Sequence, residues 1–145
     1  MKLIPYKIEY FEQVIEIFKS NISKFFHHTE LNEFINFLKH PDIEYFILED
    51  NGVIVGAGGI GLNEDQSVSL CWGMIDKRKQ SNRFGEFLLL ERIKLINNKF
   101  PKHKIISNTS QLTEQFFEKY GFITIQSDED YWAPGIHLRK MVLKA

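Results

Sequence analysis

The sequence has one cysteine and no long apolar run, and each scarcity excludes a class of protein. Cys71 has no partner for an internal disulfide, so the chain is not a disulfide-stapled scaffold. No apolar stretch approaches the roughly 20 residues that a membrane-spanning helix needs. The opening residues show no apolar segment before a small-residue cleavage site, so we expect a cytoplasmic protein.

Neither sign of charge is in excess. The 18 basic and 19 acidic residues give a net charge of −1 and are spread along the chain. A partner made of nucleic acid or anionic lipid would call for a basic patch, so we expect neither nucleic acid nor membrane as a partner. The histidines are too scattered, with a single cysteine, to indicate a zinc site, so we expect no metal.

Phenylalanine is abundant. The chain holds 13 phenylalanines in 145 residues and is 43% hydrophobic. These proportions are typical of a soluble globular protein and predict a core rich in phenylalanine. The length is that of one ordinary domain, so residues 1–145 are expected to form a single domain.

Hydrophobic spacing in the first third of the chain predicts a strand and two helices. KLIPY is a short strand. Apolar residues at i, i+3, i+4 and i+7 then begin at Phe11 and again at Leu31, which is the spacing of one helix face. Thr29 is the expected N-cap of the second helix, and Pro41 ends it.

The middle of the chain predicts a hairpin followed by a central strand. EYFILED and VIVGAGGIGL are joined by Asn51-Gly52, the strongest short-range signal for an antiparallel hairpin. SVSLCWGMI is apolar enough to lie in the centre of a sheet. The run GAGGIG lacks the following helix and acidic partner of a dinucleotide loop, so it indicates close packing within the sheet.

The last third of the chain predicts two helices and three strands. A helix buried on several sides covers 84–98, KIISNT is a strand, and a short helix over 113–120 closes at Gly121. FITIQ and IHLRKMVL end the chain as strands. The predicted fold class is therefore mixed α/β, in one layered domain.

The turn between Ile75 and Glu86 offers a site for an anion. A strand ends there, and the helix that begins near Phe84 has unpaired N–H groups at the positive end of its dipole. Four basic side chains lie in or beside the turn: Lys77, Arg78, Lys79 and Arg83. Such a helix start suits a diphosphate. From the local residues alone, a solvated basic turn is the alternative.

Several ordered segments resemble the GNAT superfamily of N-acetyltransferases. The family signature Q/R-x-x-G-x-G/A follows a central strand, and QSNRFG (80–85) supplies its first Gln and last Gly. WGMID, TSQLTEQFFEKYGF and APGIHLRKM resemble segments of one GNAT branch, in the same order. The resemblance runs from the first strand to the last. It implies a central mixed, mostly antiparallel sheet flanked by about four helices.

The resemblance also implies a site for acetyl-CoA as co-substrate. The strand that ends at Ile75 would splay from the strand 104–109, and pantetheine would enter the wedge between them. The implied cofactor-binding residues are Met74, Ile75, Gln80, Ser81, Asn82, Arg83, Phe84, Gly85, Glu86, Ser110, Phe116 and Phe117.

Three positions depart from the family pattern, and one of them is Ser81, where a further glycine is often present. Arg83 stands where the family usually has its middle glycine, and its guanidinium can reach a phosphate. Phe117 stands where many members have a tyrosine that serves as the general acid. Ser110 and Tyr131 are therefore the candidate catalytic residues. For Ser110, a helix cap is an equally good interpretation.

No carboxylate lies on the strand 67–75 to serve as a base, so a water relay is expected. His27, His28 and Glu30 stand where the first helices of the family border the acceptor, and they are candidates for substrate binding or proton uptake. A plain surface loop is the alternative for the histidines.

The resulting hypothesis is transfer of an acetyl group from acetyl-CoA to a primary amine of a small molecule or peptide. The alternative is a catalytically weak or inactive GNAT-fold protein that binds CoA as a sensor. The resemblance also allows a homodimer paired through the final strands.

Overall fold

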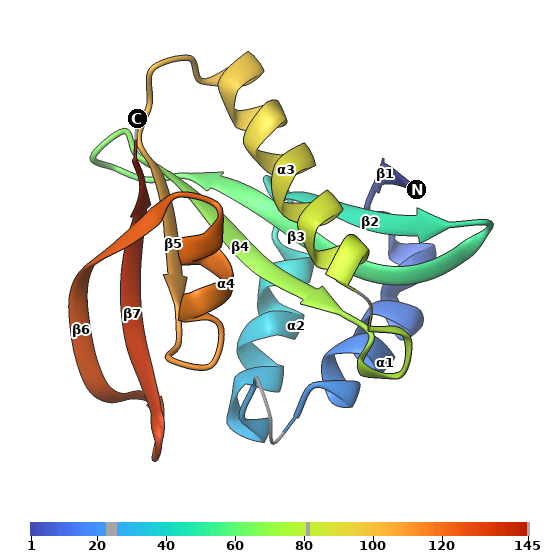
Figure 1. The fold of residues 1–145 in the computed structure, drawn as a ribbon. Coiled ribbons are helices and arrows are strands. Elements are labelled where there is room, and N and C mark those ends of the chain that lie inside the picture. Colours follow the sequence, from blue (N-terminus) through green and yellow to red (C-terminus); the bar gives the residue numbers. More distant parts are fainter. Residues whose placement is uncertain (23–25, 81, 145) are drawn as a thin grey trace.

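The computed structural model describes residues 1–22, 26–80 and 82–144 (Figure 1). Its strands form one sheet in the order β1-β2-β3-β4-β5-β7-β6, and every neighbouring pair is antiparallel except β4 and β5. The strands are β1 Lys2–Pro5, β2 Glu44–Asp50, β3 Val53–Leu62, β4 Val68–Ile75, β5 Ile105–Thr109, β6 Phe122–Ala133 and β7 Ile136–Leu143. The helices are α1 Phe11–Ser20, α2 Leu31–Lys39, α3 Asn82–Lys99 and α4 Glu114–Lys119. The predicted mixed α/β class is confirmed.

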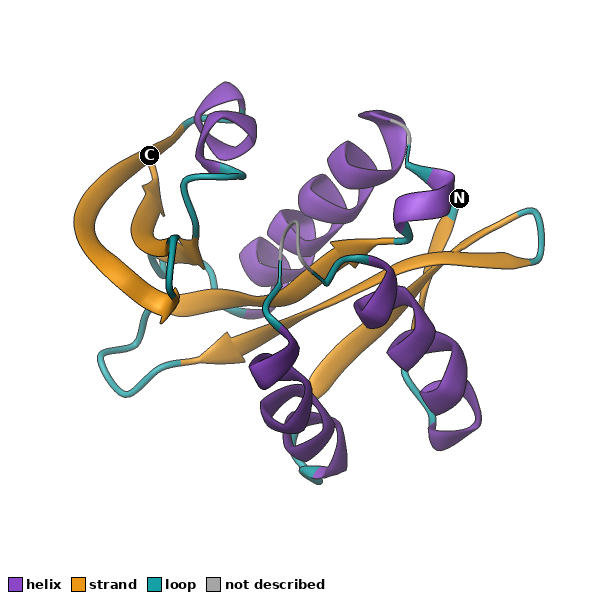
Figure 2. Ribbon diagram, turned by 90° about the horizontal axis from the view of Figure 1, so that it is seen from below, coloured by secondary structure: helices purple, strands orange, loops and turns teal. Residues whose placement is uncertain are grey.

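The helices cover both faces of the sheet. Figure 2 shows α1 and α2 on one side and α3 and α4 on the other. Phe18 and Phe34 are fully buried in the core under α1 and α2, and Phe122 is fully buried in the core under α3 and α4. The prediction of a phenylalanine-rich core is confirmed. None of the helices that the structure describes is long and apolar enough to cross a bilayer.

The predicted hairpin and central strand are confirmed. Asn51 and Gly52, with φ of 51° and 80°, join β2 to β3, which fits a two-residue turn with positive φ at both positions. β4 is the fourth of seven strands. The glycine-rich run lies in β3 as predicted: a Cβ on Gly56 would come within 2.7 Å of the Met74 carbonyl oxygen. Close strand packing is therefore the reason for that glycine.

Two local predictions were wrong. Residues 127–133 were expected to lie beyond the strand FITIQ, but β6 continues to Ala133 and pairs with β7. These residues are mostly exposed and polar, so no hydrophobic alternation announces the strand. Thr29 is not the cap before α2. His27 caps a 3₁₀ turn there, and Glu30 accepts a hydrogen bond from the backbone N–H of His27 at 3.1 Å.

β4 and β5 separate after a short parallel pairing. The paired residues are Val68 with Ile105, Ser69 with Ile106 and Leu70 with Ser107, so β4 from residue 71 to residue 75 has no partner on the β5 side. β4 also carries a bulge, since Trp72 and Gly73 face only Gly58 of β3. The splay that the resemblance implied is therefore present, and it opens the centre of the sheet.

Candidate functional site

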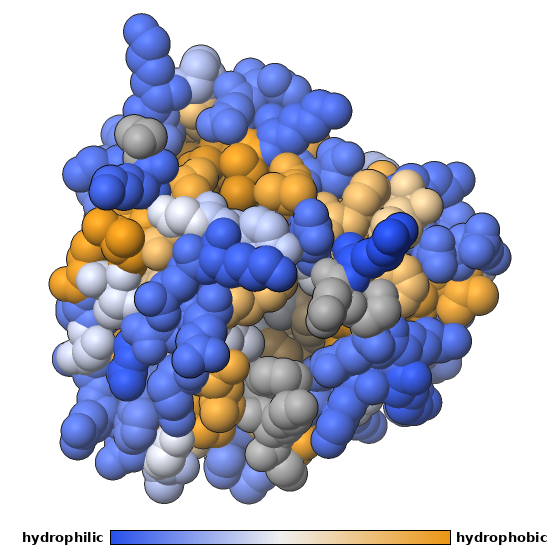
Figure 3. All heavy atoms as spheres, in the orientation of Figure 1, coloured by the Kyte–Doolittle hydropathy of each residue, from blue (hydrophilic) through white to orange (hydrophobic). Residues whose placement is uncertain are grey.

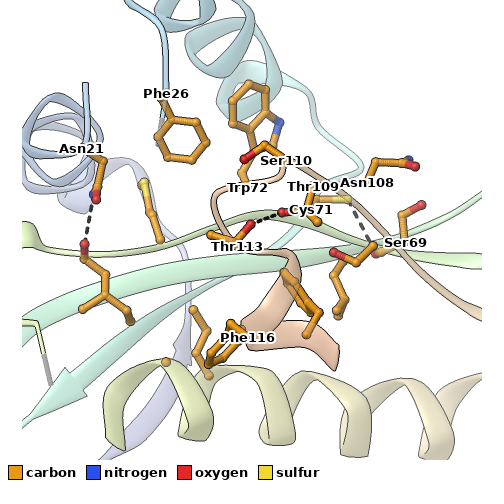
Figure 4. Close-up of a pocket in the computed structure, with 18 of the residues that line it drawn as sticks. Asn21, Phe26, Ser69, Cys71, Trp72, Asn108, Thr109, Ser110, Thr113 and Phe116 are labelled. Carbon is orange, nitrogen blue, oxygen red and sulfur yellow. Dashed lines mark hydrogen bonds between the residues drawn. The ribbon is translucent and has the colours of Figure 1, made fainter. Parts of the chain in front are cut away.

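A cavity of about 660 Å³ occupies the opening between β4 and β5. Figure 3 shows a hollow near the middle of the view, with tan, moderately hydrophobic residues at its depth and blue, hydrophilic residues among those around it. Figure 4 shows side chains from β4, β5, α4 and the end of α1 converging on the cavity. It passes between the strands, so residues from both faces of the sheet line it.

Most of the predicted cofactor residues line this cavity. Those that do so are Met74, Ile75, Gln80, Gly85, Ser110, Phe116 and Phe117. A Cβ on Gly85 would lie 3.5 Å from the Phe116 ring, an ordinary contact, so a larger side chain there would enter the cavity. The start of α3 and the α4 aromatic pair thus bound one mouth, called here the α3–α4 mouth.

The other predicted cofactor residues lie elsewhere. Phe84 packs into the core beside Leu88, Arg83 is exposed and Glu86 is half-buried. Ser81 lies outside the described residues, and Asn82 is the first residue of α3. Arg83 is within α3 and is not among the residues with positive φ, so the substitution of the family's glycine carries no backbone strain.

The turn before α3 is held by an ion pair. Asp76 is buried and accepts bonds from Arg78 Nε and Nη2, both at 2.9 Å. Burial raises the pKa of Asp76, but the bonds and charge of Arg78 outweigh it and bring that pKa below its ordinary value. Arg78 therefore braces the turn, while Lys77 and Lys79 are exposed beside it.

The end of β4 is tied to the end of α1. Asn21 is 2% exposed, and its Nδ2 donates to the carbonyl oxygens of Ile17 and Ile75, both at 2.9 Å. Ser20 Oγ accepts a bond from the Lys77 N–H at 3.1 Å. Figure 4 shows Asn21 at one side of the cavity. Sequence reasoning missed Asn21, because a polar residue at a helix end carries no signal of a distant partner.

Glu30 is the carboxylate of the opposite mouth, called here the α1–α2 mouth. Its side chain lines the cavity and the residue is 6% exposed. Burial raises the pKa of Glu30, the bond from the His27 N–H lowers it, and Glu33 raises it, with a net increase. His27 and His28 are not among the lining residues, and their rings lie against each other with centroids 4.2 Å apart.

An aromatic cluster surrounds the bulge of β4. The Trp72 ring packs against Phe18, Phe26 and Phe34. Trp72 has a φ of 44°, which is uncommon for a bulky residue and marks local strain. Tyr45 donates its hydroxyl to the Trp72 carbonyl oxygen at 2.8 Å, which helps to hold that backbone in place.

The two candidate catalytic residues lie in different places. Ser110 is buried and lines the cavity, and its Oγ accepts a bond from the Leu112 N–H at 3.2 Å, as in a cap. Tyr131 is 59% exposed and borders a separate cavity of about 230 Å³. Trp132 lines both cavities and donates Nε1 to the Thr109 carbonyl oxygen at 3.1 Å.

Two further lining residues escaped sequence reasoning. Burial raises the pKa of the Cys71 thiol. Arg92 of α3 is 4% exposed and lines the cavity as a buried cation. Its signal was a charge at the i+4 spacing between Leu88 and Ile96, two buried residues of α3. The described residues hold no group of three or more His, Cys, Asp or Glu placed for a metal.

The chain matches the family model of the acetyltransferase (GNAT) domain over residues 7–145. No curated protein matches it in sequence. Solved structures match it in fold. Ribosomal-protein-alanine N-acetyltransferase from Brucella melitensis is 15% identical with a TM-score of 0.78, and the match covers 98% of each chain.

Two other solved structures are similar over nearly the whole chain. The ribosomal-protein-S18-alanine N-acetyltransferase from Escherichia coli is 14% identical with a TM-score of 0.79, covering 98% of this chain and 92% of that one. An aminoglycoside 6'-N-acetyltransferase complexed with coenzyme A is 11% identical with a TM-score of 0.76, covering 98% and 96%. At these identities the likeness concerns the fold.

Proposed function

The chain belongs to the GNAT acetyltransferase family, and we propose that it is an N-acyltransferase that moves an acetyl group from acetyl-CoA to a primary amine of a small molecule or peptide. The observation that carries the proposal is the cavity where β4 leaves β5. It has open strand backbone along one wall and the start of a long helix at one mouth. The CoA in one structural neighbour supports the same ligand here.

The residues present fit an extended thioester cofactor. Residues 71–75 of β4 have no β5 partner, so their N–H and C=O groups are available to an extended chain such as pantetheine. The first turn of α3 offers unpaired N–H groups for the diphosphate, with Gln80 and Gly85 lining the cavity beside it. Phe116 and Phe117 supply an apolar wall.

Glu30 is the residue that we assign to the amine. A neutral amine is the nucleophile, so the ammonium must lose a proton, directly or through a water. A carboxylate with a raised pKa suits that proton uptake, and Glu30 lines the α1–α2 mouth. His27 and His28 do not line the cavity, and the contribution that we propose for His27 is to hold Glu30 through its backbone N–H.

The leaving thiolate needs a proton, and Phe117 cannot give one. Ser110 stays the proposed donor or sulfur-binding group because it lines the cavity. Tyr131, which borders the separate cavity, could serve only after moving. Alignment of the two reactants supplies much of the rate in any case. The proposed compartment is the cytoplasm, and a homodimer through β6 or β7 stays a prediction.

A thermal shift experiment tests the proposal. A ligand bound only by the folded state stabilises it by about 2.7 kcal/mol at a hundred times its Kd, so acetyl-CoA should raise the melting temperature. No shift at millimolar acetyl-CoA would contradict the proposal. A shift without thiol release over a broad panel of amines would favour the alternative of a CoA-binding sensor.

A further inference from the structure

A buried cation without a carboxylate partner lines the cavity. Arg92 donates from Nε to the Leu88 carbonyl oxygen and from Nη1 to the Gly59 carbonyl oxygen, each at 3.3 Å. Among the residues that the structure describes, no Asp or Glu forms an ion pair with it. Within the same residues, its Nη2 has no hydrogen-bond acceptor.

The sheet leaves room for this guanidinium. A Cβ on Gly73 would lie 2.7 Å from Arg92 Nη2, and one on Gly58 would lie 3.1 Å from its Nε. Any side chain at Gly73 would therefore displace the group. Glycine in a strand interior weakens the strand and marks a place where another group approaches closely. Gly73 also lines the cavity, so Nη2 lies at its wall.

The acidic groups near Arg92 do not neutralise it. Tyr45 and Cys71 are the two titratable groups that interact with its charge. Burial raises the pKa of Cys71 and raises the pKa of Tyr45 well above its ordinary value, so both stay protonated at neutral pH. Burial lowers the pKa of Arg92 to about 10, which leaves it a cation. The positive charge is therefore uncompensated.

A buried cation without an anionic partner lowers the stability of the folded protein. Removing an ion from water costs several kcal/mol, and an apolar side chain of similar volume would serve the core as well or better. Leu89 and Ile96, which are fully buried on the same helix, show that α3 packs well with aliphatic residues. An unpaired buried cation in a cavity therefore indicates a ligand oxygen that carries or develops negative charge.

The position of Arg92 indicates which oxygen this is. Arg92 lies seven residues after Gly85 in α3, about 10 Å farther along the helix axis, so it is remote from a diphosphate at the helix start. Its neighbour Gly73 lies in the stretch of β4 that has no β5 partner. A carboxylate on the acceptor is disfavoured by Glu30, which lines the same cavity. The oxygens that remain are those of the pantetheine amides and of the acyl group, and of these only the acyl oxygen develops negative charge during the transfer.

We propose that Arg92 Nη2 binds the acyl oxygen of the thioester and stabilises the negative charge that develops on it; this rests on the proposed function. As the amine nitrogen bonds to the acyl carbon, the C=O electron pair moves to the oxygen. When that pair returns, the C–S bond breaks, the attacking nitrogen loses its extra proton to become the amide nitrogen, and the thiolate gains a proton to become the thiol of CoA. Arg92 keeps its proton throughout and acts as a charge-assisted hydrogen-bond donor.

Isotope-edited infrared spectroscopy of bound acetyl-CoA, ¹³C-labelled at its carbonyl, tests this directly. In the wild-type protein the carbonyl stretch should lie at lower frequency than in water, and acetyl-CoA should bind more tightly than CoA. Arg92→Met should abolish both differences and reduce kcat by about a hundredfold, with KM little changed. Ile96→Met is the matched control, since Ile96 is buried on α3 away from the cavity and should behave as wild type.

Each remaining outcome has a definite meaning. An unshifted stretch in the wild-type protein, or the same shift in folded Arg92→Met, overturns the proposal. So does selective loss of acceptor affinity with the shift retained, since Arg92 would then serve the acceptor. Should Arg92→Met fail to fold, Gly73→Ala displaces Nη2 with one methyl group and must give the same loss. Absence of any CoA binding would instead contradict the proposed function.

Discussion

The cavity is bounded mainly by glycine backbone and apolar side chains at its α3–α4 mouth, whereas its α1–α2 mouth carries a buried amide and a buried carboxylate beside two aromatic rings. Gly85, Leu88, Phe116 and Phe117 make the first, and Asn21, Phe26, Glu30 and Trp72 make the second. A site formed mainly by backbone suits the cofactor, which is the same in every reaction cycle. A side-chain-built site can be altered residue by residue. The two mouths should therefore respond differently to mutation, the first in cofactor binding and the second in turnover.

The largest effect is expected from filling the α3–α4 mouth. Gly85→Trp should abolish the thermal shift with acetyl-CoA, because the indole would occupy the space beside Phe116. Gly85→Ala is the matched control, since its Cβ would meet Phe116 at an ordinary 3.5 Å and alanine favours the helix. Retained cofactor binding in folded Gly85→Trp would show that the diphosphate site lies elsewhere.

A smaller effect, confined to turnover, is expected at the α1–α2 mouth. Glu30→Gln should reduce kcat by about a hundredfold or more through loss of the proton acceptor, while acetyl-CoA affinity stays the same. Steady-state kinetics and calorimetry separate the two quantities. Glu33→Gln removes a neighbouring exposed carboxylate and should leave kcat nearly intact. Equal loss of cofactor affinity in Glu30→Gln would erase the distinction between the mouths.

The raised pKa of Glu30 predicts how the activity of the wild-type protein and the stability of Glu30→Gln depend on pH. The basic form exists only above that pKa, so wild-type kcat should rise with pH through a value above 4.5. The free energy of unfolding changes with pH in the opposite sense. Burial favours protonated Glu30, so the stabilisation that this proton gives to the folded state is lost as pH rises through the pKa of the folded state. At neutral pH, Glu30→Gln should therefore melt at the same or a higher temperature than wild type.

The smallest effect is expected at the bulge between the mouths. Tyr45→Phe removes the bond to the Trp72 carbonyl oxygen and should lower the free energy of unfolding by about 1–2 kcal/mol, measured by urea denaturation. Tyr10→Phe is the control, because Tyr10 packs on the same core and its hydroxyl has no partner within the described residues. An equal cost in both variants would mean that the bond at Trp72 contributes nothing.

Most of the fold could be predicted because its signals are local. Asn51-Gly52 sets a turn by its own backbone preferences, and the periodicity at Phe11 and Leu31 reports buried helix faces. The end of β6 could not be predicted, because residues 127–130 are polar and exposed and show no hydrophobic alternation. The cap before α2 was misassigned because the choice between His27 and Thr29 depends on geometry rather than on residue type.

In the candidate site, too, the residues with a local sequence signal could be predicted and those defined by tertiary contacts could not. The turn at Gln80 and the start of α3 with Gly85 were recognisable from sequence, since a family pattern marks them. Asn21 and Arg92 were not, because each gains its meaning from a contact far along the chain: Asn21 with Ile75, and Arg92 with Gly59. Tertiary contacts of this kind leave no periodicity behind. A charged residue inside an apolar helix stripe was the only hint.

The separation of β4 and β5 leaves open strand edges in the interior of a sheet. Exposed edges normally invite pairing with other chains and promote aggregation. Here the edges lie inside a cavity, with α3 and α4 on one face and α1 and α2 on the other (Figure 2). A thin linear molecule can reach these edges through the cavity. The unpaired strand edges are thus placed inside the cavity, where a narrow ligand can bind them, and not at the outer edge of the sheet, where a second copy of the chain could pair with them.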